Sequence, residues 1–395
     1  NFIVPENVDT NDVVGKFHVW FCRDTIEQLT YDIHQNVHDA YKIDHNTGVI
    51  SVNNEQMFAI ERDRIDTVLI LIKDGSIYES IDTAYVKVIE SSNCIFIDPE
   101  QSTNGDGSRT KPLNSWNKMD FEPGKAYFQR RNTIYYGGSV YINTSGNENE
   151  PIMLGSYGKG GKPILDGSSY HYNYVKGIKI GNHSSSPPIY VQWIEIYGFD
   201  CFNWGDAGIH SADDNKHIKI NNCVFRNNGQ YDAPGRGRKQ PGIYMTGDQN
   251  HDHKHIEINN CISFNNTEHG FKIESAGTKM KNCWAFNNGI TSGHGFQLIY
   301  GRNKQFEGLL AHGNKNAGIS ARGIADSYKN CIVYNNWEGV QIWQAGASVG
   351  GDSIIFNDII AYNNTNSGIL AMQNVSYCRF NNFNTFGNKF GIQLR

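Results

Sequence analysis

A short pattern of glycine, apolar residue, polar residue and apolar or small residue recurs through the second half of the chain. Its central copy reads Gly270-Phe-Lys-Ile, and the other copies begin at Gly208, Gly242, Gly295, Gly318, Gly339, Gly368 and Gly391. Successive glycines are 34, 28, 25, 23, 21, 29 and 23 residues apart, which is the range expected for the coils of a solenoid. The pattern predicts one strand per coil, stacked on the equivalent strands of neighbouring coils.

Two further strands are predicted in each coil. An Ile-x-Ile phrase leads through an asparagine, often followed by cysteine, into an apolar-x-apolar phrase, and paired asparagines follow. Asparagine tolerates the left-handed backbone of tight turns, and stacked amides can hydrogen-bond along a solenoid. We therefore expect a structural role for these pairs, which are Asn227-Asn228, Asn265-Asn266, Asn287-Asn288, Asn335-Asn336 and Asn363-Asn364.

Five of the eight cysteines share one position of the repeat, and four of the five follow an asparagine. Residues in the same phase of successive coils stack at about 4.8 Å, the spacing of strands in a sheet. We interpret the five as a buried stack of free thiols rather than as disulfides. They are Cys223, Cys261, Cys283, Cys331 and Cys378.

Residues 1–91 alternate in the manner of strands but lack the repeat, so we expect a separate domain. The phrase Ile-Asp-x-x-Thr-Gly-x-Ile within residues 41–52 resembles that of cadherin domains, which implies a Greek-key β-sandwich. Cadherin repeats bind calcium at their junctions, where this chain has Glu6 and Glu61-Arg62-Asp63. It lacks the closing Asp-x-Asn-Asp-Asn motif, and we expect a spacer or binding module without chemistry.

Residues 92–395 form the second expected domain. Its opening, Ile95-Phe-Ile-Asp-Pro99 followed by the Gly/Asp-rich stretch 104–112, resembles the start of many right-handed β-helix carbohydrate enzymes. The resemblance implies that the repeat folds as a right-handed parallel β-helix. The fold class is then all-β, with the β-sandwich in front.

Composition supports this fold class and narrows the function. The chain of 395 residues has 41 glycines, 10 prolines and only 19% charged residues, as expected for many tight turns. A formal net charge of −5 argues against nucleic acid as a partner. No apolar run approaches the roughly 18 residues that span a bilayer. Because position 1 is Asn, we expect any signal segment to have been removed or to lie outside this sequence, and we expect a secreted protein, extracellular or on a cell or virion surface.

Side chains alternate along a strand, so the residue after the apolar one should point outward. A first outward column then contains His210, Tyr244, Lys272, Gln297, Ser320, Gln341, Leu370 and Gln393. A second, two residues further along each strand, contains Ala212, Thr246, Glu274, Ile299, Arg322, Trp343, Met372 and Arg395. Aromatic rings pack on sugar rings, and amides and hydroxyls bond to sugar hydroxyls. We interpret this face as a groove for an extended sugar chain.

One stretch of the repeat resembles family nine pectate lyases. It reads Gly270-Phe-Lys-Ile-Glu274, then Lys281-Asn-Cys-Trp-Ala-Phe-Asn-Asn288, and then Gly295-Phe-Gln297. The resemblance implies that Lys272 is the base that removes the C5 proton of a uronate. That family holds calcium with an aspartate cluster one coil earlier, where this chain has Lys239-Gln-Pro-Gly-Ile-Tyr244. If a cofactor is used we expect Ca²⁺, with Asp213, Asp214 and Asp248 as alternative ligands, but we interpret these aspartates first as solvated turn carboxylates.

Elimination of a 4-linked uronate needs a base at C5, a cation beside the carboxylate and a proton for the leaving oxygen. We assign the first two roles to Lys272 and Arg322, and we take His210 as the alternative base or the acid. Nearby cations favour deprotonation of a lysine. Such cations are Arg322, Arg302 and the loop residues Arg236 and Arg238. The loop could also cover an anionic ligand. An ion pair between Lys272 and Glu274 would oppose deprotonation.

The predicted function is cleavage of an acidic polysaccharide by β-elimination, and two alternatives stay open. A β-helix glycoside hydrolase would need two carboxylates about 5–9.5 Å apart, supplied by Glu274 with Asp248 or Asp213. A non-catalytic module, of the kind found in phage tail spikes, would only bind glycan. We expect a monomer, or a homotrimer in the tail-spike case. The segment His251-Asp-His-Lys-His255 is interpreted as a turn rather than a metal site.

Overall fold

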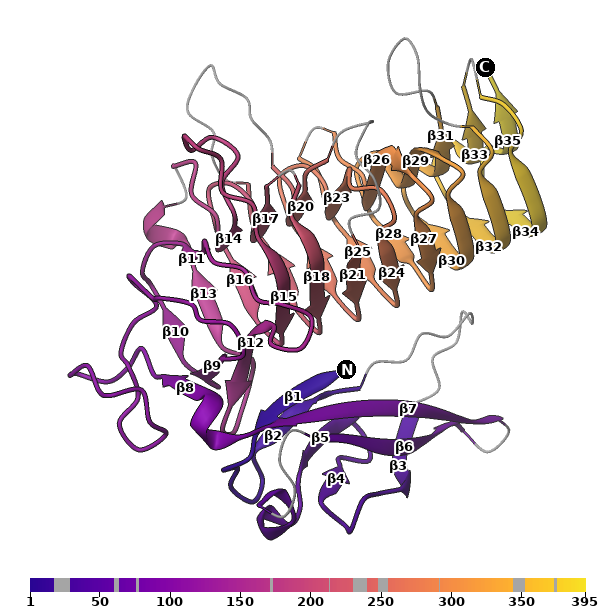
Figure 1. The fold of residues 1–395 in the computed structure, drawn as a ribbon. Helices are drawn as coiled ribbons and strands as arrows, with labels where there is room; N and C mark the ends of the chain where they lie inside the picture. Colours follow the sequence, from indigo (N-terminus) through magenta and orange to yellow (C-terminus); the bar gives the residue numbers. More distant parts are fainter. Residues whose placement is uncertain are drawn as a thin grey trace.

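The computed structural model describes residues 1–17, 29–59, 64–75, 78–170, 173–212, 214–229, 240–247, 255–290, 292–343, 352–372 and 375–395. These residues form β-strands and three short 3-10 helices, Glu55–Phe58, Ser91–Asn93 and Ser168–Tyr170. No helix among them is long and apolar enough to cross a membrane. Figure 1 shows a long stack of strands with a smaller β unit beside its first coils.

The smaller unit is a β-sandwich, as expected. One sheet has the order β1 (Phe2–Pro5), β7 (Tyr78–Ile89), β6 (Ile65–Asp74) and β3 (Leu29–Gln35). The other has the order β2 (Val13–Lys16), β5 (Val49–Val52) and β4 (Tyr41–Ile43). Apolar side chains from both sheets, among them Tyr41, Ile50 and Val68, form one buried core. Glu6 accepts a hydrogen bond from the backbone N–H of Ser91, and residues 61–63 lie outside the described part of the chain.

The remaining strands form a right-handed parallel β-helix, in agreement with the prediction. The outward face predicted from the glycine repeat is a ten-stranded sheet in which every strand pairs in parallel with the next one along the solenoid. Its strands are β11 (Val140–Ile142), β14 (Ile178–Ile180), β17 (Ile209–Ser211), β20 (Ile243–Met245), β23 (Phe271–Ile273), β26 (Phe296–Arg302), β29 (Ala317–Ile324), β31 (Glu338–Ile342), β33 (Ser367–Ala371) and β35 (Phe390–Leu394).

The other two strands of each coil belong to an 18-stranded sheet. One set consists of β8 (Cys94–Ile97), β9 (Ala126–Arg130), β12 (Ile152–Tyr157), β15 (Gln192–Tyr197), β18 (Lys216–Asn221), β21 (Ile256–Asn259), β24 (Lys279–Lys281), β27 (Gln305–Glu307), β30 (Ser327–Tyr334), β32 (Ile355–Tyr362) and β34 (Arg379–Phe386). The other set consists of β10 (Ile134–Tyr135), β13 (Ile164–Asp166), β16 (Asp200–Phe202), β19 (Val224–Arg226), β22 (Ile262–Phe264), β25 (Trp284–Phe286) and β28 (Leu310–His312). Both sets close over one continuous apolar core.

Asparagines define the turns, as the sequence indicates. The first member of each pair has a positive φ, 53° at Asn287 for example. The second member is buried and joins a ladder in which each amide bonds to the next coil. Asn288 Nδ2 donates to Asn314 Oδ1 at 3.0 Å, and Asn288 Oδ1 accepts from Asn266 Nδ2 at 2.9 Å. Asn314 and Asn388 extend the ladder although neither belongs to an Asn-Asn pair.

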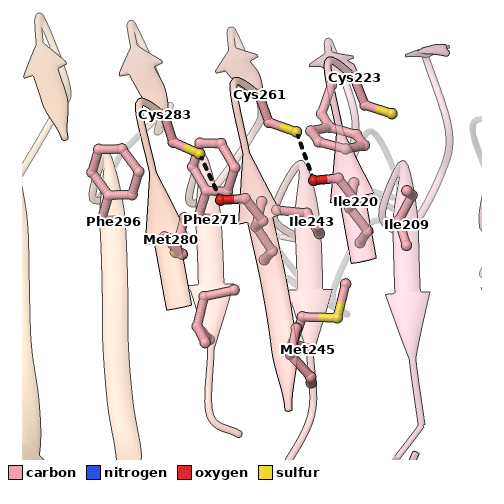
Figure 2. Packing of buried hydrophobic residues seen from close by; sticks show 14 of the residues in the cluster. Ile209, Ile220, Cys223, Ile243, Met245, Cys261, Phe271, Met280, Cys283 and Phe296 are labelled. Carbon is pink, nitrogen blue, oxygen red and sulfur yellow. Dashed lines mark hydrogen bonds between the residues drawn. The ribbon is translucent and has the colours of Figure 1, made fainter. Parts of the chain in front are cut away.

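The cysteines of the repeat are free thiols, and four of the five are buried. Figure 2 shows Cys223, Cys261 and Cys283 in successive coils, packed beside Phe271 and Met280. Their thiols donate to backbone carbonyls, as Cys283 Sγ does to the oxygen of Ile258 at 3.4 Å. The prediction of burial is wrong for Cys378, which is only half-buried because it lies in the last, incompletely covered coil.

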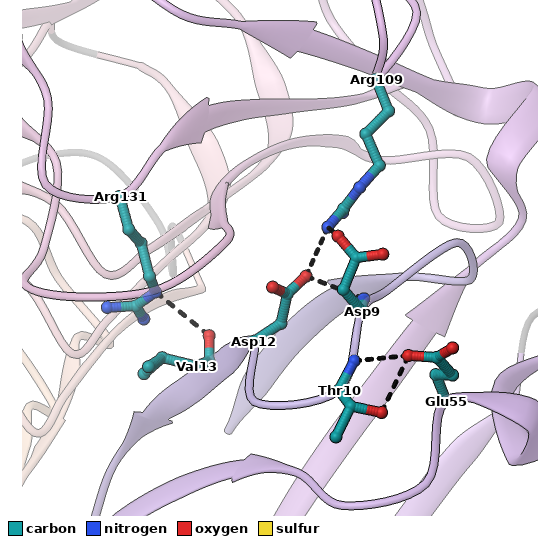
Figure 3. Close-up of polar contacts among 7 residues, drawn as sticks. All are labelled: Asp9, Thr10, Asp12, Val13, Glu55, Arg109 and Arg131. Atoms are coloured by element: carbon teal, nitrogen blue, oxygen red, sulfur yellow. Dashed lines mark hydrogen bonds and ion pairs between the residues drawn. The ribbon is translucent and has the colours of Figure 1, made fainter.

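The β-sandwich is fixed to the first coils by polar and apolar contacts (Figure 3). Arg109 Nη2 lies 2.6 Å from carboxylate oxygens of both Asp9 and Asp12, and Arg131 Nε donates to the carbonyl of Val13 at 3.1 Å. Ile3 of β1 belongs to a buried cluster with apolar residues of β8, β9 and β12. The two units therefore share a core and are not joined by a linker alone.

Candidate functional site

Strand register confirms the alignment of the first column of the ten-stranded sheet. Lys272 pairs with Tyr244 on one side and with Gln297 on the other. The same column runs from His210 to Gln393 through the predicted residues. In the second column, Ile299 pairs with Arg322. The repeated glycine pattern thus lines up side chains from consecutive coils at the strand spacing of about 4.8 Å.

Lys272 lies within a compact group of polar and aromatic side chains. Its Nζ is 3.4 Å from Glu274 Oε1 and 4.3 Å from the centre of the Tyr244 ring. Glu274 directly follows β23, so the two side chains leave the chain on the same side. About 22% of the Lys272 side chain remains exposed. The ion pair between Lys272 and Glu274 that the sequence indicated is therefore present.

Glu274 is buried, with 9% of its side chain exposed. Tyr244 donates its hydroxyl to the carboxylate, at 3.1 Å from each oxygen. Burial raises the pKa of Glu274 above its ordinary value, against the opposing effects of Lys272 and the Tyr244 hydroxyl. Burial disfavours the charged carboxylate, so this group accepts a proton more readily than an exposed glutamate does.

His210 is stacked on Tyr244, with ring centres 5.1 Å apart and planes 7° from parallel. Burial, together with Lys176, Lys179 and Lys272, lowers the pKa of His210 to about 3. The imidazole is therefore neutral near pH 7 and is poorly suited to donate a proton. Its Nε2 is buried and forms no hydrogen bond within the described part of the chain.

Arg322 is held by two neighbours of the same face. Its Nε donates to Ser320 Oγ at 3.0 Å, and its guanidinium carbon lies 3.5 Å from the centre of the Trp343 ring. Burial lowers the pKa of Arg322 to about 9, while the nearby Tyr300 raises it, so the side chain stays cationic near pH 7. Among the described residues no carboxylate forms an ion pair with Arg322.

Other polar atoms on this face are buried without a hydrogen-bond partner among the described residues. They are Gln297 Oε1, Gln341 Oε1 and Trp343 Nε1, in addition to His210 Nε2. Ser320 is fully buried beneath Arg322. Unpaired buried polar atoms cost free energy and are rare in folded proteins. These atoms lie on the same face as Lys272 and Arg322.

Several predicted residues are not brought into this group. Arg302 is exposed at the end of β26, and Asp214 lies in the turn after β17. Residues Arg236, Arg238, Asp213, Asp248 and 251–254 lie outside the described part of the chain. In the part that is described, no three His, Cys, Asp or Glu side chains are grouped closely enough to hold a metal ion. Calcium binding by the aspartates stays a prediction.

The structure adds three residues that the sequence interpretation missed. Lys179 and Tyr141 continue the first column beyond His210, and Lys179 Nζ lies 4.7 Å from the Tyr141 ring centre. The phrase Gly177-Ile-Lys-Ile has the same pattern as the other copies and could have revealed Lys179. Tyr300, near Arg322, lies within a register irregularity of β26 between Ile299 and Arg302. The repeat pattern of the sequence gives no sign of this irregularity.

No protein-family model and no curated protein matches the chain. Solved structures that resemble it include the pectate lyase Pel9A, with a TM-score of 0.46 and 16% identity over 72% of this chain and 78% of that one. A rhamnogalacturonan lyase has a TM-score of 0.46 and 18% identity over 72% and 82%. A GH136 lacto-N-biosidase from Eubacterium ramulus has a TM-score of 0.42 and 10% identity over 77% and 68%. With identities this low, the chemistry of the face must be argued from its own side chains.

Proposed function

We propose that the outer face of the ten-stranded sheet binds an acidic polysaccharide outside the cell and cleaves it by β-elimination. The observation that carries this proposal is the state of Arg322. It is a partly buried cation, fixed by Ser320 and Trp343, and no described carboxylate neutralises it. A buried charge without a counter-charge is unfavourable, so the site favours a ligand that brings a carboxylate.

Lys272 is the base in this proposal. It is two strands from Arg322 on the same face, about 10 Å along the solenoid at the usual strand spacing. Both side chains are long enough to meet one uronate, with Arg322 at its carboxylate and Lys272 at C5. The guanidinium stabilises the negative charge that develops on the carboxylate as the C5 proton leaves. The partly exposed side chains of Gln297 and Gln341 supply amides that can bond sugar hydroxyls.

Hydrolysis is the second function to be tested, because a buried glutamate with a raised pKa is the usual form of a glycosidase acid. Glu274 has this character. It is the only carboxylate in the two outward columns, whereas hydrolysis needs a second one. The suggested partners, Asp213 and Asp248, lie outside the described residues. The proposal therefore favours elimination.

Incubation with a panel of uronate-containing polysaccharides tests the proposal. Elimination leaves an unsaturated uronate at the new non-reducing end, which absorbs at about 235 nm. Growth of this absorbance together with new reducing ends supports the lyase. New reducing ends without absorbance would show a hydrolase, and retention on an affinity gel without either signal would show a module that only binds glycan.

A further inference from the structure

Elimination also needs a group that donates a proton to the leaving oxygen. The geometry around Lys272 identifies that group. His210 is the acid expected from the sequence, but burial and neighbouring lysines keep it neutral. The group that contacts Lys272 directly is Glu274, 3.4 Å from its Nζ. Tyr244 fixes the carboxylate by donating to both oxygens. The candidate acid and the candidate base are therefore in direct contact.

We propose that Lys272 and Glu274 act as one acid–base pair, and that their contact restricts the enzyme to uronates in which the C5 hydrogen and the C4 oxygen lie on the same face of the ring. This inference rests on the proposed lyase function. In this proposal the ion pair does not oppose deprotonation of Lys272, because Glu274 is the group that accepts the proton.

The proton balance of the cycle closes within the pair. Substrate covers the site and removes water, so the charged pair becomes less favourable than the neutral one. A proton then passes from Lys272 Nζ to Glu274, breaking an N–H bond and forming an O–H bond. The free amine takes the C5 proton, the electrons of that bond form the C4=C5 double bond, and the C4–O bond breaks. Glu274 gives its proton to the leaving oxygen, which restores the ammonium and carboxylate forms.

The stereochemistry follows from the position of both groups on one side of the substrate. An acid and a base in contact can reach a hydrogen and an oxygen only on the same ring face, which requires syn elimination. D-glucuronate and D-mannuronate have H5 and O4 on one face, whereas D-galacturonate has them on opposite faces. We therefore infer a substrate of gluco or manno configuration rather than a pectate-like galacturonate.

Comparison of three polymers tests the stereochemical part. Polyglucuronate or polymannuronate should give absorbance at about 235 nm at least about 10-fold faster than polygalacturonate. Faster cleavage of polygalacturonate would overturn the inference while leaving the lyase function intact. Absence of absorbance from every uronate polymer would refute the proposed function and this inference with it.

The variant Glu274→Gln tests the acid role, and Glu307→Gln is its control because Glu307 pairs with Lys281 at 3.9 Å on the other sheet. On an accepted polymer at about pH 7, Glu274→Gln should lower kcat by about 100-fold or more. Its remaining rate should rise with pH, because solvent must now take the proton from Lys272. A purely structural role would not produce that pH profile. A kcat within about threefold of the unsubstituted protein, or a reduced kcat without the rise, would overturn the assignment.

Discussion

Tyr244 donates its hydroxyl to Glu274 at 3.1 Å while the face of the same ring lies 4.3 Å from Lys272 Nζ. One residue of the preceding coil thus positions both members of the proposed acid–base pair. The contact spans two adjacent strands, β20 and β23, and depends on their parallel register. It explains why a glutamate can remain buried here beside a single lysine.

The variant Tyr244→Phe should therefore weaken the pair without removing it. The ring under Lys272 is kept, but Glu274 loses a hydrogen bond that lowers its pKa, so that pKa should rise further. We expect kcat to fall by about 10-fold, with the acidic limb of its pH profile moved upward. An unchanged profile measured by initial rates across pH would show that the hydroxyl does not act on Glu274.

Trp343 is expected to position Arg322 rather than to stack on a sugar, because the guanidinium already occupies one face of its ring. Trp343→Ala should raise KM by about 10-fold and leave kcat less affected, since the cation is kept but is no longer held in place. Arg322→Gln should lower kcat/KM by about 100-fold or more. If Trp343→Ala and Arg322→Gln lowered kcat equally and left KM unchanged, Trp343 would not act by positioning Arg322.

The lowered pKa of His210 predicts that the free energy of unfolding depends on pH. Its pKa is lowered to about 3 in the folded protein, whereas an unfolded histidine has a pKa of about 6.5. Between these values only the unfolded state binds the proton, so stability is full above about pH 6.5 and falls as the pH drops towards about 3. His210→Phe, which keeps a ring beside Tyr244, should unfold with a smaller loss of stability between about pH 7 and pH 5 in urea titrations. A loss equal to that of the unsubstituted protein would show that His210 does not contribute.

The asparagine ladder should be needed for stability and not for chemistry. Asn288→Ala removes an amide that serves both Asn266 and Asn314, leaving buried groups unpaired at a cost of about 3 kcal/mol in the free energy of unfolding. The control Asn384→Ala changes an exposed strand position and should cost less than about 0.5 kcal/mol. Urea denaturation measures both, and similar values for the two variants would contradict the ladder's role.

The columns of the face were predictable because a period of two residues and a repeated glycine fix which side chains point outward. The sequence also placed Lys272 and Glu274 on one side of a strand. The sequence also indicated that the two could form an ion pair, which is present at 3.4 Å. It did not indicate that the Tyr244 hydroxyl of the preceding coil bonds to the same carboxylate. The low pKa of His210 likewise arises from burial and from Lys176 and Lys179, which belong to a coil outside the residues first assigned to the face.

The central claim is that Lys272 removes the C5 proton, and one measurement tests it most directly. The rate of absorbance increase at about 235 nm is compared between the unsubstituted protein, Lys272→Ala and the control Lys281→Ala, using the best uronate polymer. Lys281 is an exposed lysine paired with Glu307 on the other sheet. We predict that Lys272→Ala loses at least about 1,000-fold in rate with an unchanged unfolding transition, while Lys281→Ala keeps full activity. A Lys272→Ala protein that still produces the unsaturated uronate at the original rate would contradict the account.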